Sequence, residues 1–340
     1  MTHHDSATDS EVVVVTGASA GVGRATARAF AEQGASVGLL ARGDEGLEGA
    51  RRDVENAGGE ALAIPTDVTD ADAVAAAADA VEDAFGPIDV WVNNAMTSVF
   101  SPVDEMEADE YERVSDVTYH GCVYGTMTAL DRMQPRDEGT IIQVGSALAY
   151  RGIPLQSAYC ASKHAIQGFT DSLRTELLHD DSDVRVAMVE LPALNTPQFE
   201  WVKTRFSKKP QPVPPIYQPE VAADAIVWMA HNDRTELWVG LPTVKAILGN
   251  RIVPRWLDHL LARTGWDAQL TATPAEPERD HNLWQPADDD IDYGIHGRFD
   301  DEARDRSYQL WAATHRGTVL SIVFAFVGLL VTLLARRRNS

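Results

Sequence analysis

The chain has 340 residues, a length that suits two ordinary domains or one large α/β domain with additions. Hydrophobic residues make up 44% and charged residues 24% of it, which is ordinary globular usage and argues against a disordered, collagenous or fibrous protein. The formal net charge of −22 argues against a nucleic-acid partner, which needs a clustered basic surface. Cys122 and Cys160 form no zinc or disulfide pattern, so we expect no metal site and a reducing compartment.

The acid excess itself has two interpretations that the sequence leaves open. One is the ordinary solvated surface of a soluble enzyme. The other is adaptation to high salt, in which dense carboxylates keep a protein dispersed.

Short apolar runs alternate with helical patterns through most of the chain. Residues 1–10 are polar, without the features of a signal peptide, and we expect them to be disordered. Strands are predicted at residues 11–16, 36–41, 61–64, 88–92, 140–144, 185–190 and 236–239. Helices are predicted at residues 24–33, 46–57, 70–85, 158–178 and 219–230. This alternation predicts a single doubly wound α/β domain of the Rossmann type with a parallel sheet, over residues 11–245.

The alternation fades beyond residue 245. For residues 246–316 we predict an irregular extension without recognisable chemistry. Residues 318–335 contain 14 apolar residues and no charge, enough to cross most of a hydrocarbon core about 30 Å thick. We therefore predict a transmembrane helix at residues 317–335 and a basic tail at 336–340, with the rest of the chain in the cytoplasm. A buried helix within a soluble assembly is the alternative.

A glycine-rich turn joins the first predicted strand to the first predicted helix. Gly17, Gly21 and Gly23 lie where backbone N–H groups and the positive helix end can approach a diphosphate closely. The second predicted strand ends in Ala41, followed by Arg42. An acidic residue there would bind the hydroxyls of an adenosine ribose, whereas an arginine attracts a 2′-phosphate. The sequence therefore favours NADP(H) over NAD(H).

Ser146, Tyr159 and Lys163 form a second pattern. Tyr159 and Lys163 are four residues apart and share a helix face, so the ammonium should lie near the phenol. A nearby cation favours the phenolate of a tyrosine, whose ordinary pKa is about 10, and this makes Tyr159 a usable acid and base. Ser146, at a strand end, would hydrogen-bond a substrate oxygen. A surface pair that only stabilises the helix is the alternative, and the added serine and glycine turn argue against it.

These motifs, in this order, resemble the short-chain dehydrogenase/reductase family over about residues 11–245. The resemblance implies hydride transfer between NAD(P)(H) and a carbonyl or alcohol without a metal. It gives Tyr159 the role of proton donor or acceptor, Lys163 that of binding the nicotinamide ribose, and Ser146 that of orienting the substrate oxygen. The cofactor-binding residues that the turn, Arg42 and the family's motifs indicate are Gly17, Ser19, Gly21, Val22, Gly23, Arg42, Asp67, Val68, Asn93, Ala95, Tyr159, Lys163, Pro192 and Thr196.

The sequence departs from the family pattern at Thr118. The family normally has an asparagine there, which helps to hold a water leading from the active lysine to solvent. Thr118 can still offer its carbonyl and hydroxyl, so we place it among the catalytic residues and expect an altered proton relay. Met96 and Ala193 also replace usual glycines, and we expect both changes to be tolerated.

Residues 197–218 occupy the place where relatives carry a mobile lid over the substrate. Aromatic and basic side chains interleave there: Phe199, Trp201, Phe206, Lys203, Arg205, Lys208 and Lys209. Either this lid lies near a membrane surface and admits an apolar, lipid-like substrate, or it is a solvated element whose aromatic stripe faces the core.

The function predicted from the sequence is that of an NADP(H)-preferring oxidoreductase acting on a carbonyl or alcohol group of an apolar substrate, with a membrane contact through the C-terminal helix. The resemblance also implies a homo-oligomer. The alternative is a nucleotide-binding regulatory or scaffold protein with lost or weak turnover, which the departure at Thr118 motivates.

Overall fold

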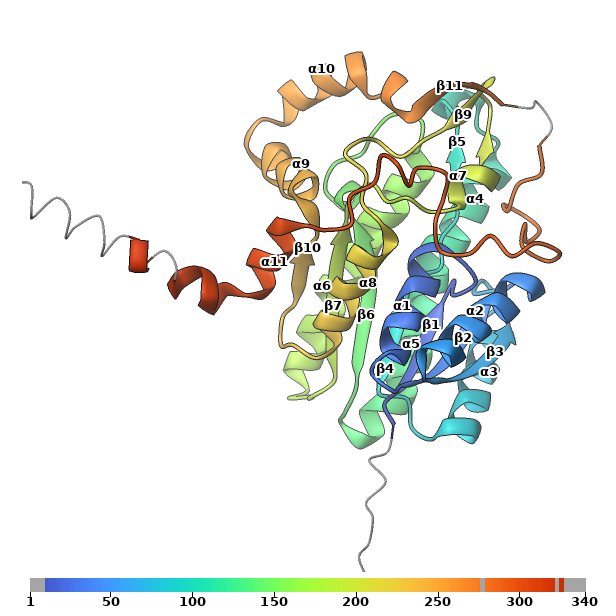
Figure 1. Ribbon diagram of the computed structural model, residues 1–340, viewed down its shortest axis with the longest axis vertical. Helices are drawn as coiled ribbons and strands as arrows, with labels where there is room; N and C mark the ends of the chain where they lie inside the picture. Colours follow the sequence, from blue (N-terminus) through green and yellow to red (C-terminus); the bar gives the residue numbers. More distant parts are fainter. Residues whose placement is uncertain (1–9, 276–278, 322–323, 327–340) are drawn as a thin grey trace, which may run out of the picture.

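The fold was analysed in a computed structural model, which describes residues 10–275, 279–321 and 324–326. A seven-stranded sheet forms its centre, with the strand order β10-β7-β6-β4-β1-β2-β3 and parallel pairing throughout (Figure 1). The strands are β1 (Val12–Thr16), β2 (Ser36–Ala41), β3 (Glu60–Pro65), β4 (Val90–Asn93), β6 (Thr140–Ser146), β7 (Arg185–Leu191) and β10 (Glu236–Trp238). The prediction of a parallel α/β sheet is confirmed.

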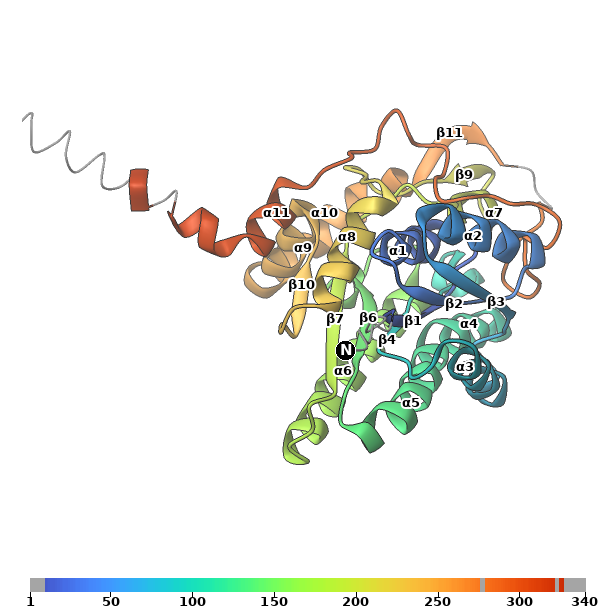
Figure 2. The same ribbon diagram turned by 60° about the horizontal axis from the view of Figure 1, so that its bottom comes forward.

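Helices cover both faces of the sheet. One layer holds α1 (Gly21–Ala31), α2 (Asp44–Ala57) and α8 (Pro219–Ala230), and the other holds α3 (Ala71–Phe85), α5 (Gly121–Met133) and α6 (Ser157–His179) (Figure 2). Each layer encloses its own apolar core: Phe30 and Ile226 are buried on the first face, and Val81 and Met133 on the second. Because both faces are covered, the central strands are apolar on both sides, which is why they read as continuous runs.

The local sequence explains where several elements begin and end. The Asp70 carboxylate accepts hydrogen bonds from the backbone N–H groups of Asp72 and Ala73, at 3.0 and 3.1 Å, and so caps the start of α3. Helix α2 ends at Gly58, whose φ of +100° suits the left-handed conformation of a C-terminal cap.

The chain between the fourth and sixth strands, and after the seventh, adds smaller elements. These are β5 (Val99–Phe100), α4 (Ala108–Ser115), α7 (Gln198–Trp201), β8 (Lys203–Thr204) and β9 (Lys208–Pro210). Short 3₁₀ turns lie at Val103–Glu105, Gln134–Arg136, Ala147–Ala149 and Asp267–Gln269, and a π turn lies at Asp116–His120. Strand β5 pairs with β8, which ties the lid segment to the body of the domain.

The segment after the sheet is less irregular than we predicted. It contains α9 (Gly240–Ile252), α10 (Pro254–Thr264), β11 (Leu270–Pro274) and α11 (Tyr308–Thr314), and β11 pairs antiparallel with β9. The expected boundary at residue 245 falls inside α9, a helix whose buried residues include Thr243 and Ile247. The extension thus packs onto the domain from its first helix onward.

The chain ends lie mostly outside the described residues. The predicted transmembrane helix at residues 317–335 is described only at 317–321 and 324–326, and the basic tail at 336–340 and residues 1–9 are not described. Within the described part of the chain, no helix combines the length and the apolar character that crossing a membrane requires.

Candidate active site

A cavity of about 460 Å³ lies at the carboxyl ends of the parallel strands. Its walls bring together the glycine turn after β1, the loop after β4, the ends of β6 and β7, and the start of α6. This edge of a doubly wound sheet is where such folds bind their ligands. Most predicted site residues line the cavity: Gly17, Ser19, Gly21, Val22, Arg42, Asp67, Val68, Ala95, Ser146, Tyr159, Lys163, Pro192 and Thr196.

The glycine turn has the backbone that a phosphate cradle needs. Gly17 and Gly21 have φ of +65° and +56°, in the left-handed region that glycine adopts without strain. A Cβ on Gly23 would lie 2.1 Å from the Gly17 carbonyl oxygen, so only glycine fits where the turn enters α1. The N-cap residue of α1, Ala20, provides no side-chain cap to the first helical turn. The Gly21 N–H donates to the Gly294 carbonyl oxygen, and the other N–H groups of this turn, which lack a side-chain cap, suit the diphosphate of a dinucleotide. The residues present therefore fit such a cofactor.

Asn94, rather than the predicted Asn93, supports this turn. The Asn94 amide donates hydrogen bonds to the carbonyl oxygens of Thr16 and Gly17, at 2.9 and 3.1 Å. The Asn93 side chain is instead buried behind the cavity, where it accepts from the Trp91 indole and donates to Thr126 and Gln143. The Asn93-Asn94 doublet therefore indicated the correct place in the chain, but the sequence alone does not show which of the two side chains supports the turn.

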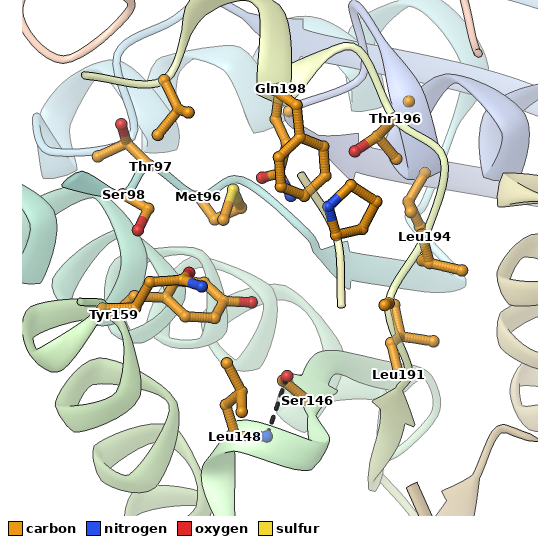
Figure 3. Close-up of a pocket in the computed structure, with 18 of the residues that line it drawn as sticks. Met96, Thr97, Ser98, Ser146, Leu148, Tyr159, Leu191, Leu194, Thr196 and Gln198 are labelled. Carbon is orange, nitrogen blue, oxygen red and sulfur yellow. Dashed lines mark hydrogen bonds between the residues drawn. The ribbon is translucent and has the colours of Figure 1, made fainter. Parts of the chain in front are cut away.

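Ser146 and Tyr159 point into the same end of the cavity. Figure 3 shows both hydroxyls directed toward the space between Met96, Leu148 and Leu191. The Ser146 hydroxyl oxygen accepts a hydrogen bond from the Leu148 backbone N–H at 3.1 Å, which fixes its position. A reacting oxygen between two hydroxyls can accept hydrogen bonds from both.

Lys163 lies beside Tyr159 as predicted, but the expected lowering of the Tyr159 pKa is not found. The Lys163 Nζ atom lies 5.6 Å from the centroid of the Tyr159 ring and donates a hydrogen bond of 2.7 Å to the Val144 carbonyl oxygen. Burial raises the pKa of Tyr159 above its ordinary value of 10, while hydrogen bonding with Ser146 opposes part of that rise. The expected lowering of the Tyr159 pKa by Lys163 is therefore not seen: burial raises this pKa, and the ammonium is directed at a backbone carbonyl.

Two buried ionisable groups lie beneath these hydroxyls. Burial lowers the pKa of the Lys163 ammonium to about 8, against the attraction of Cys122 and Glu190. Burial also raises the pKa of the Glu190 carboxyl to about 8, with repulsion from Glu236 adding to the rise. Glu190 is fully buried on β7, opposite Gly145 on β6, and no sequence pattern predicted a buried carboxyl behind the site.

Thr118 lies beside the site rather than in it. Its hydroxyl donates to the Thr97 carbonyl oxygen at 3.1 Å and accepts from the Thr97 N–H at 3.2 Å, and Thr118 does not line the cavity. A threonine at this position therefore fixes the loop after β4. Gly23 and Asn93 also lie behind the lining residues.

The lid segment differs from the exposed aromatic and basic surface that we considered. Phe199 is buried against Phe100 and Phe299, and Lys203 and Arg205 each pair with the Glu110 carboxylate at 2.6 Å. The interpretation of an aromatic stripe that faces the core is the one that the structure supports. Phe199, Trp201 and Val202 also line the cavity, so the lid forms part of its wall.

The C-terminal extension closes the other end of the cavity, which the sequence did not predict. Asn282, Pro286, Ala287 and Asp288 line it on the side where Arg42 and Asp67 lie. These residues lie far from the glycine turn in the sequence, and no local sequence pattern predicts that they lie at the same cavity.

Comparisons with known proteins agree with this geometry. The family model of the short chain dehydrogenases matches residues 11–205. The uncharacterized oxidoreductase YxnA of Bacillus subtilis is 32% identical over 331 residues, which cover 96% of this chain and 91% of YxnA. The 3beta-hydroxysteroid dehydrogenase 1 of Eggerthella lenta is 37% identical over 231 residues, which cover 65% of this chain and 87% of that enzyme.

A solved structure of an oxidoreductase is also similar to this chain. The crystal structure of a metagenomic short-chain oxidoreductase in complex with NADP is 30% identical, with a TM-score of 0.57, over 67% of this chain and 96% of the other. The chain therefore belongs to the short chain dehydrogenase family, and it is an oxidoreductase with a nicotinamide cofactor that acts on hydroxyl or carbonyl groups.

Proposed function

We propose that the protein transfers a hydride between NADP(H), preferred over NAD(H), and a carbonyl or alcohol group of an apolar substrate. The observation that carries the proposal is one cavity with the glycine turn at one end and the side chains of Ser146, Tyr159 and Lys163 at the other. The nicotinamide, when bound, supplies or accepts the hydride.

Tyr159 would act as the general acid in the direction of carbonyl reduction. Because burial keeps the phenol protonated, it has a proton to donate to the substrate oxygen as that oxygen gains negative charge. The Ser146 hydroxyl would hold the same oxygen in place, and the Lys163 ammonium, which lies beside the Tyr159 ring, would bind the ribose of the cofactor. In alcohol oxidation the same groups would act in the reverse order.

Two observations support the preference for NADP(H). Arg42 lies at the end of β2 and lines the cavity, where its guanidinium suits a 2′-phosphate. The similar metagenomic oxidoreductase was crystallised with NADP.

The walls around Tyr159 support an apolar substrate. Met96, Leu148, Ile153, Phe199 and Val202 surround this end of the cavity and offer few hydrogen-bonding groups. One similar enzyme is a hydroxysteroid dehydrogenase, whose name describes a large apolar alcohol. We therefore propose an apolar, lipid-like class of substrate, with a secondary alcohol or ketone as the reacting group.

Turnover and cofactor binding can be tested together. Purified protein is incubated with NADPH and a panel of apolar aldehydes and ketones while the absorbance of the reduced nicotinamide is followed. We expect Tyr159→Phe to lose about 10²–10⁴-fold in kcat and to keep its affinity for NADPH, because only the proton donor is removed. Binding of NADPH by the unaltered chain without turnover of any substrate would favour the regulatory or scaffold alternative.

We also propose that the apolar run at residues 317–335 anchors the enzyme to a membrane, with the catalytic domain in the cytoplasm. The proposal rests on the 14 apolar residues and the absence of charge within residues 318–335. Deletion of residues 317–340 should move the protein from the membrane to the soluble fraction of disrupted cells. An intact chain that is already in the soluble fraction contradicts the anchor.

A further inference from the structure

The part of the extension at residues 281–297, here called the strap, runs along the cofactor end of the cavity. In Figures 1 and 2 it is the orange-red coil that passes beside α2. The Arg24 guanidinium, which is buried, binds the Asp292 carboxylate of the strap and the Asp53 carboxylate of α2. The strap is therefore attached to the same helices that follow β1 and β2.

Backbone carbonyl groups of the strap accept hydrogen bonds from N–H groups at the starts of α1 and α2. The N–H groups of Glu45 and Gly46 donate to the carbonyl oxygens of Asp289 and Asp288, at 3.3 and 3.0 Å. The Gly21 N–H donates to the Gly294 carbonyl oxygen at 3.1 Å. Two N–H groups in the first turn of α2, which begins two residues after Arg42, are thus satisfied by the extension.

Arg42 is held by the strap as well. Its two terminal nitrogens donate to the carbonyl oxygens of Trp284 and Asn282, at 3.0 and 2.5 Å. Charges of both signs act on it: the Arg113 guanidinium, which pairs with Asp67, repels it, whereas Asp67, Asp288 and Asp289 attract it. A 2′-phosphate that reaches Arg42 therefore also meets the negative charge of the strap carboxylates.

Asp288 is the strap carboxylate that lies against the start of α2 at this end of the cavity. Its residue is 8% exposed and lines the cavity. A Cβ on Gly43 would lie 2.0 Å from one of its carboxylate oxygens, and a Cβ on Gly46 would lie 2.4 Å from the other, so both glycines leave room for the carboxylate. Within the described part of the chain, no group donates a hydrogen bond to this carboxylate. A carboxylate without a protein donor that lines a ligand cavity can accept a hydrogen bond from the ligand.

We propose that Asp288 is a cofactor-specificity residue, which accepts hydrogen bonds from the adenosine ribose hydroxyls and opposes the binding of a 2′-phosphate. In many dinucleotide-binding folds an acid near the end of the second strand has this task, and here Arg42 stands there instead. The strap supplies the carboxylate from the other end of the chain. Ribose hydroxyls are hydrogen-bond donors, whereas a phosphate offers acceptors and repels a carboxylate. Arg42 and Asp288 thus act in opposite directions, and their balance sets the ratio of affinities for NADP(H) and NAD(H).

This inference rests on the proposed function in one respect, which is that the cavity binds a dinucleotide. The experiment measures dissociation constants by calorimetry with the full chain for NADPH, NADH and two ligands without nicotinamide, 2′,5′-ADP and 5′-ADP. We expect Asp288→Asn to bind NADPH and 2′,5′-ADP about tenfold more tightly and NADH a few-fold more weakly, since one repulsive charge and one acceptor are removed. Asp288→Ser removes the same charge with a smaller side chain and should shift the ratio in the same direction.

Asp290→Asn is the matched control, because Asp290 is exposed, lies two residues further along the strap and loses the same charge, without being among the charge neighbours of Arg42. It should change each affinity less than about twofold if the effect requires the position of Asp288 rather than the net charge. Equal ratios in Asp288→Asn and the unaltered chain, with melting temperatures that show both to be folded, would overturn the role of Asp288 while leaving the proposed function intact. Failure of the unaltered chain to bind any of the four ligands would overturn both.

Discussion

The buried carboxyl of Glu190 predicts how the stability of the protein depends on pH. Its carboxyl is fully buried on β7, and burial raises its pKa from 4.5 to about 8. Between these two values the native state holds a proton that the unfolded state has lost. The stability that depends on this proton is therefore present at low pH and is lost as the pH rises toward 8. Lys163, Glu236 and Asp171 are the charged groups that act on it.

Replacement of this carboxyl by an amide should remove that dependence. We expect Glu190→Gln to match the unaltered chain at pH 5 and to gain about 2–4 kcal/mol in relative free energy of unfolding by pH 8. Urea unfolding at a series of pH values measures the difference. Glu60→Gln, at an exposed position, should follow the unaltered chain throughout. Parallel curves for Glu190→Gln and the unaltered chain would show that the Glu190 carboxyl is charged or solvated in the native state.

Single residues also show where sequence patterns stop being informative. The positions of Ser146, Tyr159 and Lys163 at one cavity follow from strand ends and helix spacing, and the structure brings them together. The rise in the pKa of Tyr159 could not be predicted from the sequence, because it depends on burial by residues distant in the chain. Thr118 was assigned to the site by position in a motif, but the direction of its hydroxyl depends on the loop at Thr97.

The glycine turn between β1 and α1 is an element whose geometry predicts a large effect. We expect Gly23→Ala to weaken NADPH binding by about tenfold or more and to lower stability, since the new Cβ would overlap the Gly17 carbonyl and the Asn94 amide. Calorimetric titration with NADPH and thermal melting measure the two effects. Gly168→Ala is the control within α6, where a Cβ meets no atom within 4 Å. It should bind normally and gain up to about 1 kcal/mol of stability.

An ion-pair cluster ties the lid segment to α4. The Glu110 side chain is 2% exposed and contacts both Lys203 and Arg205. We expect Glu110→Gln to lower the free energy of unfolding by about 2–4 kcal/mol, because two partly buried cations lose their counter-charge. Trypsin should also cut more rapidly at Lys203 and Arg205, and NADPH should slow the cleavage if the lid closes over a filled cavity. Glu112→Gln, on the exposed side of the same helix, should change neither the stability nor the rate of cleavage.

Elements were predictable where their periodicity is local. The strands and helices of the sheet were read from apolar runs, and β2 was predicted with the bounds that the structure has. Helices α4 and α5 were not predicted, although α5 covers one face of the sheet. The path of the strap could not be read at all. Its position depends on contacts such as that between Arg24 and Asp292, which lie 268 residues apart.

At the scale of the whole molecule, the net charge of −22 sets how stability should respond to salt. Repulsion among exposed carboxylates destabilises the compact state, and dissolved ions screen it. The Debye length falls from about 10 Å at 0.1 M to about 3 Å at 1 M salt, so general screening is nearly complete well below molar concentrations. The two interpretations of the acid excess therefore differ in the range over which the melting temperature rises.

A melting series in KCl separates them. An ordinary solvated surface predicts a rise of the melting temperature up to about 0.2 M and little change beyond, because the repulsion between carboxylates is by then screened. Adaptation to high salt predicts a rise that continues into the molar range. We expect at least the first rise, since 51 acidic residues face 29 basic ones. A series in NaCl at the same ionic strengths checks that the early rise is screening rather than specific binding of potassium. A melting temperature that is flat or falls from the lowest salt onward would show that the repulsion is already offset within the fold by ion pairs such as those of Arg24 and Glu110.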